Sequence, residues 1–382
     1  MTRPLLILVA GLLAAPAVAQ NPTAWPPKDF VEYYSAARVH AAGGNPYDGA
    51  QLLPWQDAML PAADHSGVVM LWTPPWTLPL YTPFGWLEPR AAQLAWVGTQ
   101  ALLLLLSGLG LAAVYGGGKP WAWLVPVTVL FTSAEVPWLL YFGQNSAVVL
   151  AGLAGFLYFR TRGYPVAAGL VGALTAVKPH LLLPFATLLL LDARTPAGRR
   201  VLRGGVLALV VGSALAALPN RAIFADFLTA MTAPGTPEVP TVTDWEVPLV
   251  SYHLRVAIDP AQFRWQFLPA ALACLGYAVV RVRAVTPWDW PARLPLVVLV
   301  SLLAAPYGAW VFDLVLLAVP VTATIFLALT SGRAVTIVAA VALHLLRSAA
   351  AANIPSLGGG WPMTPIALAG YALVEALTRR KP

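Results

Sequence analysis

The chain of 382 residues is 59% hydrophobic and only 10% charged, whereas soluble domains carry about 25% charged residues. Apolar runs of roughly 18–20 residues, the length that crosses a bilayer, recur along it, so the composition excludes a soluble domain and the continuity of the runs excludes a β-barrel. The net charge of +7 comes from basic residues gathered at loop ends, a pattern of membrane orientation rather than nucleic-acid binding, and the single cysteine, Cys274, excludes a disulfide framework.

The first apolar run, MTRPLLILVAGLLAAPAVAQ, allows two interpretations. Its A-V-A-Q ending and the positive charge of Arg3 fit a cleaved signal peptide, whereas the same run also fits an uncleaved first helix. Both interpretations place residue 21 on the outer side of the membrane, so the later elements do not depend on the choice.

Residues 21–90 form a long outer segment in which PPKDFVEYYSAARVHAAGG predicts a short helix. Asp29 is a favourable N-cap, and two glycines end the helix. Because apolar residues recur at helical spacing, we expect the helix to lie flat on the membrane. Glu32 and Arg38 then form a solvated face, unless they belong to a site. The later run WTPPWTLPLYTPFGWL is too rich in proline for a regular span and predicts a broken helix at the interface.

Further apolar segments predict a single integral membrane domain over residues 1–382, all-α and polytopic, with about 12 transmembrane helices. The segments cover residues 91–114, 121–140, 146–159, 165–178, 180–191, 202–219, 265–281, 294–305, 311–330, 334–352 and 363–378. A second outer segment, 220–264, contains an extended Pro-rich loop. Most of the 23 basic residues fall on the inner side of this topology and most of the 16 acidic residues on the outer side, which places both termini in the cytoplasm.

The segments 165–178 and 180–191 predict a short hairpin, because basic loops flank both of them. The first arm reaches only about 21 Å, which is short of a full crossing. We therefore expect the tip, Lys178-Pro179-His180, at or just below the outer interface.

Ionisable side chains within the apolar segments indicate function, because they are costly in hydrocarbon. We expect six of them to gather at the outer leaflet: Glu135, Lys178, His180, Asp313, His344 and Arg347. Lys178 and Arg347 suit a phosphate, which arginine binds through two parallel hydrogen bonds. The alternative for Arg347 is a side chain that extends to the interface. Gln144 and Asn145 either complete a tight turn or bind a sugar hydroxyl.

Several motifs, in this order, resemble glycosyltransferase family 87 of the GT-C superfamily. They are Asp29-Phe30 with Tyr33-Tyr34 and Ala37-Arg38, Gly44-Asn45-Pro46-Tyr47-Asp48, Trp72-Thr73-Pro74-Pro75-Trp76, Gly143-Gln144-Asn145 and the glycine-rich approach to Lys178-Pro179. The resemblance runs from about residue 28 to about residue 320. It implies a GT-C-like helical bundle, with an uncleaved first helix and a first outer loop that carries interfacial helices and the catalytic aspartate, here Asp29. The turn over residues 305–313 departs from relatives, which often carry two histidines there; those histidines are absent from this chain, and Asp313 stands nearby.

The resemblance implies an inverting glycosyltransferase, chiefly a mannosyltransferase, that takes a sugar from polyprenyl phosphate on the periplasmic or extracellular face of the plasma (inner) membrane. Asp29 is expected to take the proton of an acceptor hydroxyl, and Lys178, with Arg347 or His180, to stabilise the leaving lipid phosphate. Contacts to the sugar or to a glycan or glycolipid acceptor are expected from Glu32, Tyr33, Arg38, Gln144, Asn145 and Asp313. The chain has no D-x-D triplet, so we expect no obligatory metal, and we expect no cofactor and no nucleic-acid partner.

Two other functions compete with this interpretation. A sugar-lipid transporter or flippase explains the polytopic pattern, but such proteins often contain two matching halves, and no second copy of the KDFVEYY region is evident. A structural membrane subunit also explains the pattern but leaves Lys178 and Glu135 without a purpose. The identity of the sugar stays open between mannose and a pentose such as arabinose.

Overall fold

The computed structural model describes residues 28–59, 67–233, 249–284, 288–352 and 363–379, and these residues form helices and no strand. The chain divides into two compact units. The first comprises residues 1–102, 140–145 and 207–245, and the second comprises residues 103–139, 146–206 and 246–382. The predicted helix within residues 1–20 and the segment PGTPEVPTVTDWEVP lie outside the described residues.

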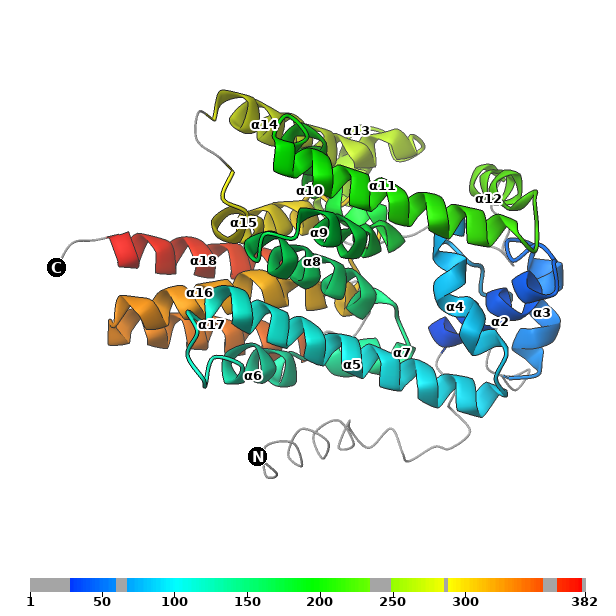
Figure 1. Cartoon of the computed structure of the whole chain (residues 1–382), viewed down its shortest axis with the longest axis horizontal. Helices are drawn as coiled ribbons and strands as arrows, with labels where there is room; N and C mark the ends of the chain where they lie inside the picture. The colour runs from blue at the N-terminus through cyan, green and yellow to red at the C-terminus, as the bar shows by residue number, and fades with distance from the viewer. Residues whose placement is uncertain (1–27, 60–66, 234–248, 285–287, 353–362, 380–382) are drawn as a thin grey trace. The chain divides into compact units, whose positions relative to one another are not determined.

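The first unit is built around α2 (Lys28–Ala41), which packs against α4 (Leu78–Gly85) and α3 (Gly49–Asp57), as Figure 1 shows. The helix α2 ends where the glycine pair predicts, because Gly43 adopts a φ of 78°, the left-handed conformation that closes helices. A 3-10 turn, η2 (Pro75–Thr77), precedes α4, so the proline-rich run is a broken helix as predicted. The unit also contains α12 (Ile223–Thr232).

The burial of α2 differs from the prediction of a helix lying flat on the membrane. The side chains of residues 30–40 are buried except for that of Arg38, which is half-buried. An interfacial helix keeps its polar face in solvent, whereas Glu32 is buried here. The prediction of a solvated face is therefore wrong for Glu32, whereas the orientation of α2 to the membrane stays a prediction, and α2 is the core of its unit.

The second unit contains the remaining apolar helices, and α16, α17 and α18 lie side by side within it (Figure 1). Its elements are α6 (Leu124–Thr132), α8 (Ser146–Thr161), α9 (Pro165–Gly172), η3 (Ala173–Val177), η4 (Pro179–Leu182), α10 (Leu183–Asp192), α13 (Val250–Ile258), η6 (Phe263–Phe267), α14 (Leu268–Arg283), α15 (Trp290–Leu303), η7 (Val311–Leu317), α16 (Ala318–Ser331), α17 (Ala334–Ala352) and α18 (Met363–Arg379). Three helices contribute residues to both units: α5 (Pro89–Tyr115), α7 (Glu135–Phe142) and α11 (Pro196–Ala217).

Two predicted spans are bent, and proline explains both bends. The segment predicted as one helix over 121–140 is α6 and α7, which meet at 70°, because Pro137 has no N–H for the carbonyl of Ser133 and its ring crowds that carbonyl. The predicted hairpin is also confirmed, since its arms meet at 119° around Lys178. Pro179 forces Lys178 out of the helical conformation, to φ −128° and ψ 72°.

Fewer helices of the described residues are long enough to span a membrane than the sequence predicts. Among the described residues, four helices are long and apolar enough to cross a membrane, and up to six spans result if each bent pair counts as one. Every predicted segment from residue 91 onward nevertheless contains helix. The structure therefore fits a polytopic membrane protein, but the predicted count of about 12 helices is not confirmed.

Candidate functional site

In the first unit, the turn Gly143-Gln144-Asn145 lies against the start of α2. The side-chain nitrogen Nε2 of Gln144 donates a hydrogen bond to Oδ2 of Asp29 at 2.8 Å. The hydroxyl of Tyr33 donates to Oε1 of Gln144 at 3.1 Å. The carboxylate of Asp29, which is half-buried, is thus connected through one amide to a buried phenol one turn further along its own helix.

Asp29 lies inside the helix and not at the predicted cap. The helix α2 begins at Lys28, so Asp29 lies in its first turn and not at the N-cap. A carboxylate in the first turn is still favourable, because the helix dipole is positive there. Its hydrogen bond to Gln144 is a tertiary contact that the capping interpretation does not include.

The turn itself is held by contacts on both sides of Gln144. Gly143 adopts a φ of 68°, and a Cβ atom there would lie 2.7 Å from the Cβ of Phe30. The indole of Trp96 donates to the carbonyl of Gly143 at 2.6 Å, and Nδ2 of Asn145 donates to the hydroxyl of Tyr81 at 2.8 Å. Only glycine combines this conformation with so close an approach to α2.

Aromatic packing supports the same turn. The rings of Tyr33 and Tyr81 stack with centroids 4.8 Å apart, and Trp96 contacts both of them. Burial raises the pKa of Tyr81 to about 12, so its phenol is neutral at any physiological pH. Tyr81 therefore holds the side chain of Asn145 as an uncharged group, and its stacking keeps the ring of Tyr33 beside Gln144.

Two further predicted site residues of α2 contact neighbouring backbone. Oε1 of Glu32 accepts a hydrogen bond from the backbone nitrogen of Trp72 at 3.4 Å. Arg38 donates to the carbonyl of Gly85 at 2.9 Å, and its guanidinium lies over the ring of Trp55 at 4.2 Å. These contacts tie the proline-rich run and α3 to α2, and the predicted contacts of Glu32 and Arg38 with a sugar stay predictions.

The motif Gly44-Asn45-Pro46-Tyr47-Asp48 forms a turn and a cap. Oδ1 of Asn45 accepts from the backbone nitrogen of Tyr47 at 2.9 Å, and the hydroxyl of Tyr47 donates to the carbonyl of Thr73 at 3.0 Å. Asp48 caps α3 by accepting from the nitrogen of Ala50. The motif thus connects α2 to α3 and to the proline-rich run.

The second unit contains a buried ion pair at the tip of the predicted hairpin. Nζ of Lys178 lies 2.6 Å from Oδ1 of Asp313, and the exposed fractions of the two residues are 8% and 1%. The hydroxyl of Ser146 donates to the same carboxylate oxygen at 2.5 Å and accepts from Lys178 at 3.1 Å. Lys178, predicted at the donor phosphate, and Asp313, predicted at the sugar or acceptor, therefore contact each other directly.

The turn over residues 305–310 holds Asp313 in place. The hydroxyl of Ser251 donates to the carbonyl of Ala305 at 2.7 Å, and the side chain of Gln266 donates to the carbonyl of Pro306 at 2.6 Å. Ala309 has a φ of 52°, the one positive φ of a non-glycine residue among those described. The backbone nitrogen of the next residue, Trp310, donates to Oδ2 of Asp313 at 3.1 Å.

His180 packs against the same turn. Its ring stacks on that of Tyr307 with centroids 4.2 Å apart. A Cβ atom on Gly308, whose φ is 69°, would lie 2.7 Å from Nε2 of His180. The residues that the sequence predicts at the hairpin tip and at this turn are thus brought together in one unit.

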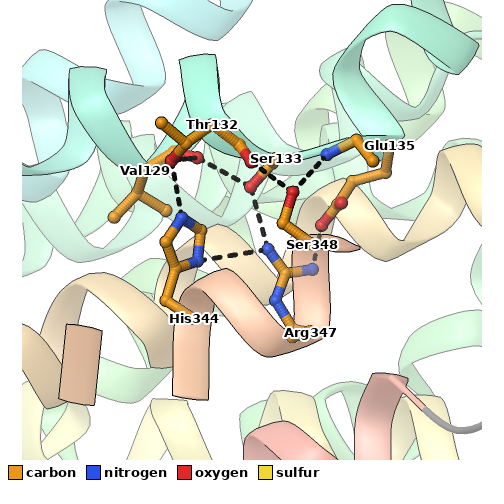
Figure 2. Close-up of polar contacts among 8 residues, drawn as sticks. Val129, Thr132, Ser133, Glu135, His344, Arg347 and Ser348 are labelled. Atoms are coloured by element: carbon orange, nitrogen blue, oxygen red, sulfur yellow. Dashed lines mark hydrogen bonds and ion pairs between the residues drawn. The ribbon is translucent and has the colours of Figure 1, made fainter. Parts of the chain in front are cut away.

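Arg347 and His344 belong to a different set of contacts, which Figure 2 shows. Arg347, with 1% of its surface exposed, forms an ion pair with Glu135 and donates to the hydroxyl of Ser133 at 2.8 Å. His344 contacts the hydroxyl of Thr132 at 2.7 Å. Arg347 does not extend to an interface, and its predicted role at a phosphate stays a prediction.

The α17 side of this cluster braces the bend between α6 and α7. The hydroxyl of Ser348 donates to the carbonyl of Thr132 and accepts from the nitrogen of Ala134 (Figure 2). The bend separates these two backbone groups from helical partners, and an unpaired buried group of this kind is costly. The polar face of α17 therefore has a structural explanation within the second unit.

Sequence reasoning did not identify Ser146, Tyr81 and Trp96. Ser146 could have been identified from its position, because it directly follows Gly143-Gln144-Asn145 and is the polar first residue of an apolar helix. Tyr81 and Trp96 resemble interface anchors in the sequence, and only their contacts distinguish them. In the part of the chain that the structure describes, no group of three or more His, Cys, Asp or Glu side chains is arranged to hold a metal ion.

Comparison with known proteins gives one finding. The family model of glycosyltransferase family 87 matches residues 71–306, which include Gln144, Asn145, Lys178 and His180. Asp29 and Asp313 lie outside the matched residues. No curated protein and no solved structure matches the chain.

Proposed function

The chain belongs to glycosyltransferase family 87, and from this premise we propose that it transfers a sugar from a polyprenyl-phosphate donor to a glycan or glycolipid acceptor. In this proposal the transfer takes place on the outer face of the membrane and inverts the configuration of the anomeric carbon. The apolar helices support the membrane location. A donor with a polyprenyl tail suits an enzyme whose helices stand in lipid. Mannose is the sugar that the family resemblance favours.

Asp29 is the proposed general base. It takes the proton of the acceptor hydroxyl while that oxygen attacks the anomeric carbon. The bond from the anomeric carbon to the phosphate oxygen breaks, and its electron pair leaves with the lipid phosphate. One carboxylate suffices, because a phosphate monoester has a second pKa of about 6 and leaves without a dedicated acid.

The observation that carries this proposal is the hydrogen bond from Gln144 to Asp29. A carboxylate that only caps a helix bonds to backbone nitrogens of its own first turn. Asp29 accepts a hydrogen bond from a side chain 115 residues away, which a capping role does not require. A base needs a fixed direction and a stabilised negative charge, and such a contact supplies both.

Lys178 is the proposed contact for the donor phosphate, with His180 beside it. Asp313 holds the ammonium group of Lys178 at 2.6 Å, so the lysine is ordered before a donor arrives. A preorganised cation stabilises charge that develops on a leaving phosphate without reorganising during the reaction. Arg347 is the weaker candidate, because its guanidinium, only 1% exposed, is held in a separate set of contacts with Glu135 and Ser133.

The test is a transfer assay with the purified protein in lipid. Polyprenyl phosphates that carry labelled mannose, arabinose or glucose are offered one at a time with membrane glycolipids as acceptors. We expect one label to move into a glycan or glycolipid product, with release of polyprenyl phosphate. Movement of an intact labelled lipid across the bilayer, with no new glycosidic bond from any donor, contradicts the proposal and favours a flippase.

A further inference from the structure

The contacts around Gln144 carry one step beyond the proposed function. We infer that Gln144 is a positioning residue for the base Asp29, and that Tyr33 sets the orientation of its amide. The inference rests on the proposed function, because it assigns a role at the same site. It replaces the predicted contact of Gln144 and Tyr33 with a sugar or acceptor by a role in holding the carboxylate.

The chemistry of the three groups dictates the direction of every hydrogen bond. An ionised carboxylate only accepts, so the group that faces Oδ2 of Asp29 must be the NH₂ end of the Gln144 amide. The carbonyl end, Oε1, then faces Tyr33 and only accepts, so the phenol must donate. The reversed amide would place two acceptors against each other at Asp29, so the ionised carboxylate selects the orientation of the amide, and the hydrogen bond from Tyr33 to Oε1 holds the amide in it.

The phenol is suited to this task because it is fixed in space. Tyr33 is 3% exposed, and its ring is stacked on Tyr81 and in contact with Trp96. Trp96 also holds the carbonyl of Gly143, the residue before Gln144. The backbone that precedes Gln144 and the oxygen of its side-chain amide are thus both held by the aromatic cluster of Tyr33, Tyr81 and Trp96.

Two substitutions of Gln144 separate positioning from packing. Gln144→Met keeps the length and removes both hydrogen bonds. Gln144→Glu keeps an oxygen for Tyr33 but replaces the NH₂ donor by a second carboxylate oxygen beside Asp29. If Gln144 only fills space and satisfies Tyr33, Gln144→Glu is the milder change. If Gln144 holds the base, Gln144→Glu is at least as harmful, because like charges disfavour the ionised carboxylate.

The experiment measures kcat and KM for the labelled donor that the transfer assay identifies. We expect kcat to fall about 10- to 100-fold in Gln144→Met, the range for one hydrogen bond to a charged group, with KM for the donor little changed. Gln144→Glu should fall as far or further. Wild-type kcat in both folded variants, or a milder effect of Gln144→Glu than of Gln144→Met, overturns the inference.

Tyr33→Phe tests the orienting role with the smallest change, the loss of one hydroxyl. We expect a fall of kcat in the wild-type background and little further effect in the Gln144→Met background, because no amide is left to orient. Additive effects of Tyr33→Phe and Gln144→Met contradict the connection. Melting temperatures in detergent identify any variant that fails to fold, and where Gln144→Met fails, wild-type kcat in folded Tyr33→Phe overturns the inference.

Failure of the inference is distinguishable from failure of the proposed function. Full transfer by the Asp29→Asn variant shows that Asp29 is not the base, which contradicts both the proposed function of Asp29 and its positioning by Gln144. An inactive Asp29→Asn variant beside fully active Gln144 variants leaves Asp29 as the base and removes only its positioning by Gln144.

Discussion

Gly143 offers a sharp test of how the turn is fitted to α2. In Gly143→Ala, the new methyl group meets the Cβ of Phe30 at 2.7 Å, which is far inside van der Waals contact. The substitution also places alanine at a φ of 68°. The left-handed conformation costs about 1–2 kcal/mol, and overpacking of a well-packed core costs about 1–3 kcal/mol. We therefore expect a loss of about 2–5 kcal/mol in the free energy of unfolding.

Gly163 is a matched control for this substitution. Its φ is 79°, and a Cβ atom there meets nothing within 4 Å. Gly163→Ala should therefore cost only the conformational part, about 1–2 kcal/mol. Equilibrium unfolding of both variants in mixed micelles measures the difference, which isolates the contact with Phe30.

The same pair of variants should differ in activity. Phe30 follows Asp29, and Gly143 precedes Gln144, so a displacement at this contact moves the carboxylate away from the amide that holds it. We expect Gly143→Ala to lose transfer activity at temperatures where it is still folded, and Gly163→Ala to keep it. Equal losses of stability in the two variants, together with full activity of Gly143→Ala, would refute the reasoning.

Three further predictions concern stability. Ala309→Gly and the nearby Ala305→Gly both remove a buried methyl group, but only residue 309 has a positive φ, which glycine adopts without strain. Ala309→Gly should therefore be the more stable variant by about 1–2 kcal/mol, and equal thermal unfolding of the two in detergent would contradict this. Glu135→Gln alone should lower the free energy of unfolding by about 3–5 kcal/mol, because it leaves the charge of Arg347 buried without its partner carboxylate. The double variant Glu135→Gln with Arg347→Met should lose less, and a double variant less stable than Glu135→Gln contradicts the pairing. The pKa of Tyr81 is about 10 in the unfolded chain and about 12 in the folded one, so the contribution of Tyr81 to stability is complete below pH 10 and is lost as the pH rises toward 12. Wild type should therefore lose stability faster than Tyr81→Phe between about pH 9 and 11.5. Parallel stability curves of the two proteins would contradict the raised pKa.

Most of the apolar helices from residue 91 onward could be predicted from the sequence to within a few residues, because hydrophobic run length and helix-ending residues are local signals, whereas α3, α12 and α13 were not predicted. The spans 91–114 and 146–159 correspond to α5 and α8, and Gly43 ends α2 as its position indicates. The bend at Ser133 was missed because the apolar run continues through it. Pro137 was the local signal, since a proline within an apolar run frees the carbonyl four residues before it.

The enclosure of α2 was beyond the sequence for a different reason. Its polar residues alternate with apolar ones in a way that fits a helix at a surface, and burial on every side depends on partners that are distant in the chain. Ser35 illustrates this, because it receives a hydrogen bond from the side chain of Gln56 within the core. A helix with satisfied polar groups on its inner faces has the same sequence pattern as one that lies in solvent.

The candidate site was predictable in its residue types and less so in its pairings. Asp29, Gln144 and Lys178 stand out in the sequence as costly or exceptional residues, but the sequence does not show that Gln144 bonds to Asp29 or that Asp313 bonds to Lys178. Those pairs are 115 and 135 residues apart. The expected gathering of six ionisable residues divides in the structure, since Lys178 pairs with Asp313 and Arg347 pairs with Glu135.

The central claim is that the carboxylate of Asp29 takes the proton in glycosyl transfer, and one pair of variants tests it most directly. Asp29→Asn is compared with Asp48→Asn, the same chemical change at the N-cap of α3, where asparagine caps as well as aspartate does. With the labelled donor that wild type uses, we expect transfer to be abolished in folded Asp29→Asn and kept in Asp48→Asn. Full transfer by Asp29→Asn would contradict the account.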